Sequence, residues 1–500
     1  MKITNKEDRQ VRTDTFIGVF IALVIFFIAL RIPFDTDFFW HLNAGKVMDN
    51  QQSILLTDLF SFTKFNDHWT NHSWLSQILF YLTYKFSGYL GIMIFVAVVT
   101  TATMLLIYKS MLGKSILKAF LIVFAVLISA VVWSPRPQIF SLLCFAILYQ
   151  FITKYDKTSN RKYLFFIGFL FLIWSNLHAG FSLGILFVFL FILGKIIDLI
   201  VNYEKYKNEK IKIISLVILL AVCICIVCIN PNGINTWKVQ FDTVSIGTLQ
   251  NQIDEWASPD FHKIEQQPYL WIWLLFVLFL GVTTYKFRFQ EILPILAFGA
   301  LGFIAKRNYA IFAIVIFPSL SKIIVSFIGT EIRSPYFFRN WKSSVDKINV
   351  IPKPIFQKII NFSFIILAGF AIILKIVYLG NELVLKTYEK KLYPAEAIGF
   401  LEMNSIPDGN LLNSYAWGGY INWKNPKLLV FVDGRTDLFG DEILGDWIKL
   451  VNSESEYQDL LLKYDIGWVF LEKDLPIVKT LINDNWQVFY SDNIAIILKQ

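Results

Sequence analysis

The sequence is poor in charged residues, in cysteine and in histidine. Asp, Glu, Lys and Arg make up 17% of its 500 residues, whereas about 25% is typical of a soluble domain, so an ordinary cytosolic enzyme is not expected. The four cysteines lie inside apolar runs, where thiols behave as small hydrophobic groups, and they offer no disulfide framework. No glycine-rich phosphate loop of standard spacing occurs, which argues against a nucleotide site. The net charge of +8 is spread over loops and does not indicate a nucleic-acid partner.

Long apolar segments dominate the sequence instead. Hydrophobic residues make up 56% of the chain, and 48 Phe and 15 Trp exclude disorder. A helix that crosses a bilayer needs about 20 apolar residues, and no small-residue cleavage site marks the first apolar run as a signal peptide. We therefore predict a polytopic α-helical membrane protein with about eleven transmembrane helices. The predicted spans are 15–33, 89–108, 115–133, 138–153, 163–177, 180–201, 211–229, 268–285, 289–305, 308–327 and 358–379.

The basic residues between these spans predict the orientation. If the N-terminus is cytoplasmic, the inner segments hold twenty-four Lys and Arg residues. The outer loops before residue 380 then hold eight, apart from Arg31 at a helix end. Because positive charge favours the cytoplasmic side of short loops, we expect a multi-pass protein of the cytoplasmic membrane with its N-terminus inside and its C-terminus outside.

Two aspartates follow the first span on the predicted outer face. Polar groups near the membrane are costly, so those that persist are functional candidates. Asp35 can cap a helix that begins near Asp37, and His41 lies one turn later on the same face. A second amphipathic helix is expected at 73–86. The two carboxylates suit a general base or a divalent metal site; the alternative is that they form a helix cap and a surface ion pair.

Basic residues occur at the same predicted depth. Arg136 stands between two prolines that stiffen its loop, and a guanidinium held there suits bidentate contact with a lipid phosphate. Lys306 and Arg307 form an exception to the basic bias of the inner side and also suit a phosphate. There are alternatives to phosphate binding. Arg136 would extend its charged end from the membrane interface to water, and Lys306 and Arg307 would anchor the chain at the membrane surface.

Further candidates lie in other outer segments. His178, at an outer helix end, fits either a catalytic role or a hydrogen-bonding one. Asp254 and Glu255 belong to the loop 230–263, which either closes over an acceptor or is simply solvated.

A small extracytoplasmic α/β domain is predicted at 380–500, after a transmembrane domain at 1–379 whose first outer loop is 34–88. In the C-terminal domain, Trp417-Gly-Gly-Tyr420 resembles a surface on which sugar rings stack. Asp433 and Arg435 follow an apolar strand and form either a ligand site or a buried ion pair that docks the domain. Strands are expected at 410–414, 428–433, 467–472, 486–491 and 494–499, and helices at 394–404, 441–452, 455–464 and 475–483.

Several motifs together resemble a known superfamily. They are Asp35-Thr-Asp37-Phe-Phe-Trp40-His41, Thr57-Asp58-x-Phe-Ser61, His72-Ser-Trp74-Leu75, Ser134-Pro-Arg136-Pro-Gln138, Trp174-x-Asn176-x-His178, Asn230-Pro231-x-Gly233 and Asp433-Gly-Arg435-x-Asp437. With the Asp-x-Asp in the first outer loop and a C-terminal outer domain, they resemble the GT-C glycosyltransferases, and in detail a bacterial GT-C-like group. The resemblance spans almost the whole chain.

The resemblance implies a membrane glycosyltransferase that moves a sugar from a polyprenyl-phosphate-linked donor, with inversion, to a glycan, lipid or protein acceptor. It places the protein in the bacterial cytoplasmic membrane, in contact with membrane lipid. The expected roles are catalysis for Asp35 and Asp37, which would also hold a divalent metal ion if one is used; donor phosphate binding for Arg136, Lys306 and Arg307; and substrate binding for His41, His178, Asp254, Glu255, Asp433 and Arg435.

Two other functions remain open. A transporter or flippase of lipid-linked glycans would use the same outer face, although no internal repeat is visible and the polar groups do not lie at mid-depth. A non-catalytic scaffold for envelope assembly would use the outer domain as a binding module.

Overall fold

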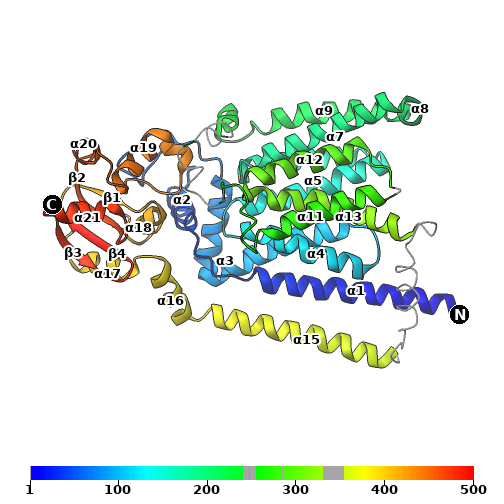
Figure 1. The fold of residues 1–500 in the computed structure, drawn as a ribbon, viewed down its shortest axis with the longest axis horizontal. Coiled ribbons are helices and arrows are strands. Elements are labelled where there is room, and N and C mark those ends of the chain that lie inside the picture. The colour runs from blue at the N-terminus through cyan, green and yellow to red at the C-terminus, as the bar shows by residue number, and fades with distance from the viewer. Residues whose placement is uncertain (1, 240–246, 248–254, 284, 330–353) are drawn as a thin grey trace.

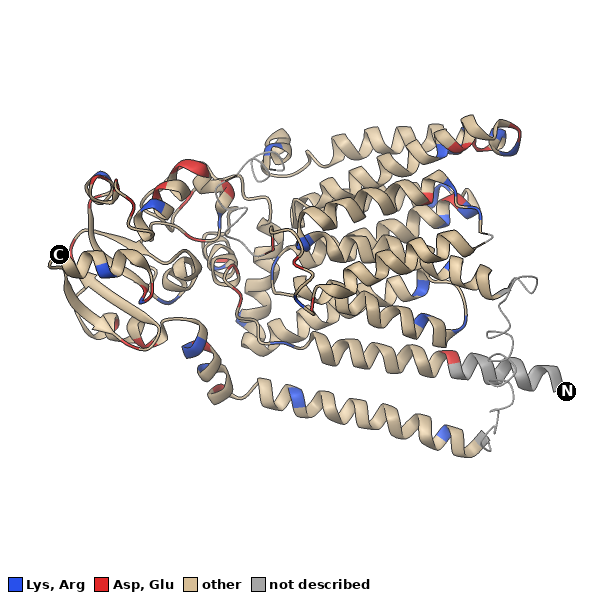
Figure 2. Ribbon diagram, viewed as in Figure 1, with Lys and Arg blue, Asp and Glu red and all other residues tan. Residues whose placement is uncertain are grey.

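The computed structural model describes residues 2–239, 247, 255–283, 285–329 and 354–500. In this part of the chain, long helices lie side by side in a bundle, and the C-terminal α/β part caps one end of it (Figure 1). The N-terminal end of α1 (Lys2–Ala29) lies at the opposite end. Figure 2 shows charged residues gathered toward the two ends of the bundle helices and sparse along their middles.

Each predicted span coincides with most of a helix. The long apolar helices have exposed Phe, Ile, Leu and Val side chains, as expected of surfaces that face lipid. Beyond α1, these helices are α3 (Trp74–Ser110), α4 (Ser115–Ser129), α5 (Gln138–Thr158), α6 (Lys162–Leu177), α7 (Phe181–Val201), α9 (Lys210–Ile226), α11 (Gln267–Val282), α12 (Phe289–Ile304), α13 (Tyr309–Gly329) and α15 (Pro354–Leu379).

Six of the described helices are long and apolar enough to cross a membrane. They are α3, α4 with the turn after it, α5, α7, α13 with the turn before it, and α15. Shorter apolar helices lie within α1, α6, α11 and α12. These helices fit a multi-pass membrane protein, while the count of eleven spans stays a prediction.

The segment 34–88, predicted to be the first outer loop, contains the two expected helices. The first is α2 (Phe38–Gln51), which packs against the second, the opening turns of α3. The backbone of α3 breaks at Gly88, whose φ of 59° lies in the left-handed region that glycine tolerates best. The break lies between the predicted amphipathic helix 73–86 and the predicted span 89–108.

The C-terminal part contains one four-stranded sheet among the described residues. Its strand order is β1-β2-β4-β3, with β1 and β2 parallel and the other two pairs antiparallel. Asp492 closes the turn between the last two strands, because its Oδ1 accepts the backbone N–H groups of Ile494 and Ala495 at 2.9 and 2.8 Å. The elements are α16 (Glu382–Leu392), α17 (Ala395–Met403), β1 (Asn410–Asn413), α18 (Gly418–Lys424), α19 (Thr436–Val451), α20 (Tyr457–Lys463), β2 (Ile466–Glu472), α21 (Pro476–Asn483), β3 (Gln487–Ser491) and β4 (Ala495–Lys499).

One predicted strand and one predicted surface are wrong. The apolar segment 428–433 does not join the sheet; Val430 instead pairs with the first outer loop, donating its N–H to Phe60 O and accepting from Phe62 N–H, both at 3.1 Å. Trp417 and Tyr420 form no exposed sugar-stacking surface, because they are 4% and 1% exposed. Tyr420 stacks on Tyr393 at a centroid distance of 4.6 Å, in the apolar contact between α18 and α2.

Candidate active site

Asp35 and Asp37 lie at the end of the bundle that faces the C-terminal part. Asp35 Oδ1 accepts the backbone N–H of Asp37 at 3.0 Å, which fixes the turn that leads into α2. The Asp37 side chain makes no capping bond to the helix backbone. Its Oδ1 accepts the Nε1–H of Trp40 at 3.2 Å instead. Asp35 therefore forms an Asx turn just before the helix, and the Asp37 carboxylate bonds to Trp40 rather than to the helix backbone.

Arg136 joins both aspartates. It lies in the short proline-flanked connection between α4 and α5, and its Nε forms an ion pair with Asp35. Its Nη1 lies 2.9 Å from Asp37 Oδ2 and 3.2 Å from Glu255 Oε2. The four side chains are between 17% and 24% exposed, so the cluster is accessible but largely shielded from water. The guanidinium predicted to bind phosphate is thus surrounded by three carboxylates.

Burial is the main influence on the acidity of Asp37. It raises the pKa of this carboxyl to about 6, while Arg136 opposes the shift and the negative charges of Asp35 and Glu255 add to it. A carboxylate with a pKa near neutrality accepts a proton more readily than one with the ordinary value of 3.8, and still is mostly ionised at pH 7.

Arg307 lies on the same side of the molecule. The backbone N–H of Arg307 donates to Glu255 O at 3.1 Å, and that of Lys306 donates to Ala257 O at 3.3 Å. The turn between α12 and α13 therefore holds the segment that carries Glu255. The Arg307 guanidinium lies 4.3 Å from the ring centroid of Trp256 and forms no ion pair within 4 Å to any other described residue. Lys306 is buried, and Asp254 lies outside the described residues.

The two predicted histidines lie in the interior near this cluster. His41 is 4% exposed, and burial lowers its pKa well below the usual value, so it is neutral. His178 Nδ1 accepts the N–H of Gly180 at 3.0 Å and lies 2.7 Å from Ser141 Oγ, which favours the hydrogen-bonding role. His72, which carries no predicted role, has its ring 6.0 Å from that of His178. Its buried Nδ1 has no hydrogen-bond partner in the described structure and lies 3.8 Å from Asp437 Oδ2.

A turn of the C-terminal part completes the wall of the site. Arg435 is fully buried and pairs with Asp433 at 2.7 Å and with Asp58 of the first outer loop at 2.6 Å. This geometry favours the docking interpretation of Asp433 and Arg435 over direct substrate binding, because all three side chains are shielded from solvent. Asp58 carries no predicted role; the signal that could have identified it is its place in the motif Thr57-Asp58-x-Phe-Ser61.

The comparisons with known proteins concern fold. No protein-family model matches the sequence, and neither does any curated protein. Among solved structures, the chain is similar to the archaeal oligosaccharyltransferase AglB from Archaeoglobus fulgidus in complex with an inhibitory peptide and a dolichol-phosphate, with a TM-score of 0.53 and 11% identity over 91% of this chain and 69% of that one. The chain therefore shares its overall fold with this oligosaccharyltransferase.

Two further similar structures are of ArnT from Cupriavidus metallidurans. The structure bound to undecaprenyl phosphate has a TM-score of 0.49 and 11% identity, over 96% of this chain and 97% of that one. The apo structure has a TM-score of 0.47 and 11% identity, over 100% and 98%. The statement that the fold is shared rests on the similarity to AglB alone.

Metal binding at Asp35 and Asp37 requires a change in their partners. Both carboxylates are paired with Arg136, so a cation between them would have to displace the guanidinium. Over the described ranges, no group of three or more His, Cys, Asp or Glu side chains is arranged to hold a metal ion. The arrangement that is present suits proton transfer by a carboxylate whose position an arginine fixes.

Proposed function

We propose that the protein is a membrane glycosyltransferase that moves a sugar from a polyprenyl-phosphate-linked donor to an envelope glycan, lipid or protein acceptor. The proposed site of action is the outer face of the bacterial cytoplasmic membrane, with the N-terminus inside and the C-terminus outside. The observation that carries the proposal is the Asp35–Arg136–Asp37 cluster at one end of a GT-C-fold bundle. Support for the donor class comes from AglB, whose structure contains a dolichol-phosphate.

Asp37 is the proposed general base. Its raised pKa and its fixed contacts with Trp40 and Arg136 suit it to accept a proton from an acceptor hydroxyl or amide. As that proton moves to the carboxylate, the acceptor atom forms a bond to the sugar C1 and the bond from C1 to the phosphate oxygen breaks. Asp35 and Arg136 then act as positioning groups, because both hold Asp37 through direct contacts.

Arg307, assisted by Lys306, is the proposed ligand of the donor phosphate. The leaving phosphate gains negative charge in the transition state, so a fixed cation beside it lowers the barrier. Arg136 is committed to three carboxylates, whereas the Arg307 guanidinium has no carboxylate within 4 Å among the described residues and rests on Trp256. This arrangement moves the main phosphate contact from Arg136 to Arg307.

Mass spectrometry of envelope glycans and glycolipids tests the proposal. A strain that lacks the protein is compared with its parent and with strains complemented by the wild type, by Asp37→Asn or by Asp49→Asn. Asp49 is the matched control, since it lies on the same helix α2 and pairs with Lys85 away from the cluster. We expect one sugar to be missing without the protein, restored by the wild type and by Asp49→Asn, and still missing with Asp37→Asn.

Two results would contradict this function. Accumulation of an intact lipid-linked glycan on the inner face would indicate a transporter. Full restoration by Asp37→Asn at wild-type abundance would remove the proposed base and favour a scaffold.

The phosphate role is tested separately with purified protein in detergent. Arg307→Ala is expected to weaken binding of a polyprenyl phosphate by one to two decades, because a lost charge-assisted contact costs about 1.5–3 kcal/mol. Arg31→Ala is the control, since that arginine sits at the end of α1 and bonds to backbone carbonyls. Equal binding by both variants would contradict the assignment of Arg307.

A further inference from the structure

Charged residues also gather at the other end of the bundle, remote from the C-terminal part (Figure 2). Lys195 is fully buried there and forms ion pairs with Asp156 at 2.5 Å and with Glu209. Arg288 pairs with Asp198 at 3.2 Å and with Glu209 at 3.1 Å. These charged side chains therefore pair with one another between helices.

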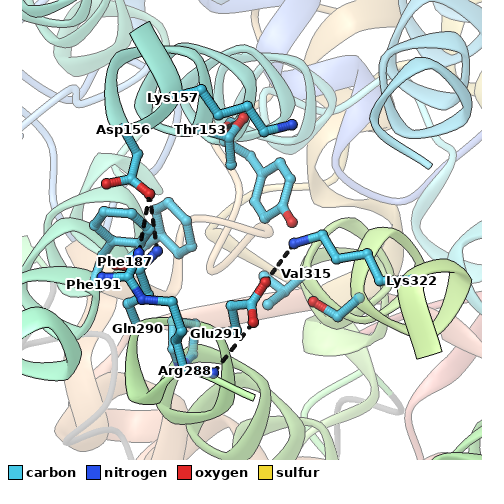
Figure 3. Close-up of a pocket in the computed structure, with 13 residues that line it drawn as sticks. Thr153, Asp156, Lys157, Phe187, Phe191, Arg288, Gln290, Glu291, Val315 and Lys322 are labelled. Carbon is cyan, nitrogen blue, oxygen red and sulfur yellow. Dashed lines mark hydrogen bonds and ion pairs between the residues drawn. The ribbon is translucent and has the colours of Figure 1, made fainter. Parts of the chain in front are cut away.

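A cavity of about 180 Å³ opens beside this cluster. It lies between α5, α7, α12 and α13, and Figure 3 shows its lining side chains converging from these helices. Phe187, Phe191 and Val315 supply apolar wall, while Lys157, Arg288 and Lys322 supply positive charge. Sites that enclose drug-sized ligands measure about 300–1,000 Å³, so this cavity suits a smaller ligand with a few polar groups.

The charges that line the cavity are unequal. Two carboxylates line it, and both are already paired: Asp156 with Lys195 and Gln290, and Glu291 with Lys322 and Tyr285. Lys157 is exposed and forms no ion pair within 4 Å in the part of the chain that the structure describes. Arg288 is paired with Asp198 and Glu209, and Lys322 with Glu291, so Lys157 is the lining cation that an anionic occupant would neutralise.

Gln290 provides an independent indication of an occupant. It lines the cavity and is 6% exposed, and its Nε2 donates to Asp156 Oδ2 at 3.0 Å. Its Oε1 is buried and has no hydrogen-bond partner in the described structure. Buried acceptors are nearly always satisfied, so this oxygen calls for a donor such as a hydroxyl group.

We infer that the cavity binds a polyol phosphate, meaning a phosphate ester with free hydroxyl groups. The phosphate contacts Lys157 and Lys322 at the mouth, a hydroxyl donates to Gln290 Oε1, and the carbon chain lies against Phe187. The source is either a free glycerol phosphate or the headgroup of a glycerol-bearing phospholipid, since both present the same chemistry. This site is separate from the proposed transfer reaction and does not depend on it.

Binding to the purified full-length protein tests the inference. Calorimetry in detergent uses glycerol 3-phosphate, with monoethyl phosphate as the probe that lacks free hydroxyls. Native mass spectrometry compares retention of phosphatidylglycerol and phosphatidylcholine. The variants are Lys157→Ala and the control Lys154→Ala. Lys154 lies on the same helix as Lys157, but its exposed side chain lies over the ring of Tyr163 and does not line the cavity.

We expect Lys157→Ala to weaken binding of glycerol 3-phosphate or phosphatidylglycerol at least tenfold, and Lys154→Ala to leave it unchanged. Binding of the soluble probe identifies a free ester as the source, and selective retention of phosphatidylglycerol alone identifies the lipid headgroup. Three results would each overturn the inference. The first is an equal effect of the two substitutions, and the second is equal binding of monoethyl phosphate. The third is no preference for phosphatidylglycerol together with no binding of glycerol 3-phosphate.

Discussion

The backbone of Gly434 lies directly against the side chain of Asp37. A Cβ atom built at Gly434 would lie 2.0 Å from Asp37 Oδ1 and 2.6 Å from Trp40 Nε1. Arg435 follows Gly434 in the chain and is buried between Asp433 and Asp58. These ion pairs hold Gly434 close to Asp37. The C-terminal part therefore forms one wall of the proposed site and limits where the Asp37 carboxylate can lie.

Gly434→Ala is expected to displace Asp37 and to reduce transfer by about two decades. A small misplacement of a catalytic group costs about a hundredfold in rate, and the added methyl group has no room beside the carboxylate. Folding should be retained, because the clash concerns one side chain on the rim of a site. The measurement is kcat of purified protein together with its thermal midpoint.

Gly445→Ala is the matched control for this substitution. Gly445 lies in α19, and a Cβ there would meet nothing within 4 Å. Alanine stabilises a helix interior by about 0.5–1 kcal/mol relative to glycine, so activity should stay unchanged and the midpoint should rise slightly. If Gly434→Ala were as active as Gly445→Ala, close contact with Asp37 would have no catalytic importance.

Replacing the aspartates separates catalysis from capping. Asp37→Asn is expected to lower transfer by several decades while the protein stays folded, because asparagine cannot accept the acceptor's proton. Asp35→Asn should be as severe or less severe, since asparagine can still accept the Asp37 N–H but loses its charge toward Arg136. Transfer assayed in detergent, with no membrane to cross, removes any contribution from transport. Wild-type rates for both variants would leave capping as the only role.

The pH dependence of transfer should report Asp37. The ionised carboxylate is the proposed base, so kcat/KM is expected to fall as pH decreases through about 6. Glu255→Gln removes a negative charge that raises this pKa, so the acid limb should move to lower pH; Arg136→Gln removes a positive charge that lowers it, so the limb should move to higher pH. Shifts in the opposite directions, or an unchanged limb in both variants, would assign the limb to another group.

Much of the helical architecture could be predicted because its signals are local. A continuous apolar run such as α15 predicts a membrane helix whatever it packs against. The helix after Asp37 and the hairpin at Asp492 follow from turn and capping preferences within a few residues. These elements agree with the structure for that reason.

The contacts that form the site are not local and could not be predicted. Asp58 and Arg435 are 377 positions apart, and Glu255 reaches Arg136 across 119 positions. An apolar segment such as 428–433 has the pattern of a strand, but nothing in that pattern states whether its partner is the sheet or the first outer loop. Each buried charge likewise has the same local sequence whether solvent or another helix surrounds it.

The buried ion pairs of Arg435 give a stability prediction. Arg435→Ala would leave Asp433 and Asp58 buried without their cation, and breaking a buried pair by removing one partner costs about 3–5 kcal/mol. Lys463→Ala is the control, because the Lys463–Asp446 pair involves a side chain that is 48% exposed and an exposed pair is worth about 0–1 kcal/mol. The measurement is the thermal midpoint in detergent, followed by limited proteolysis to show whether the C-terminal part has separated from the first outer loop. A loss of stability equal to that of Lys463→Ala would mean that the two parts are held together by the apolar contact of α18 with α2 rather than by the buried arginine.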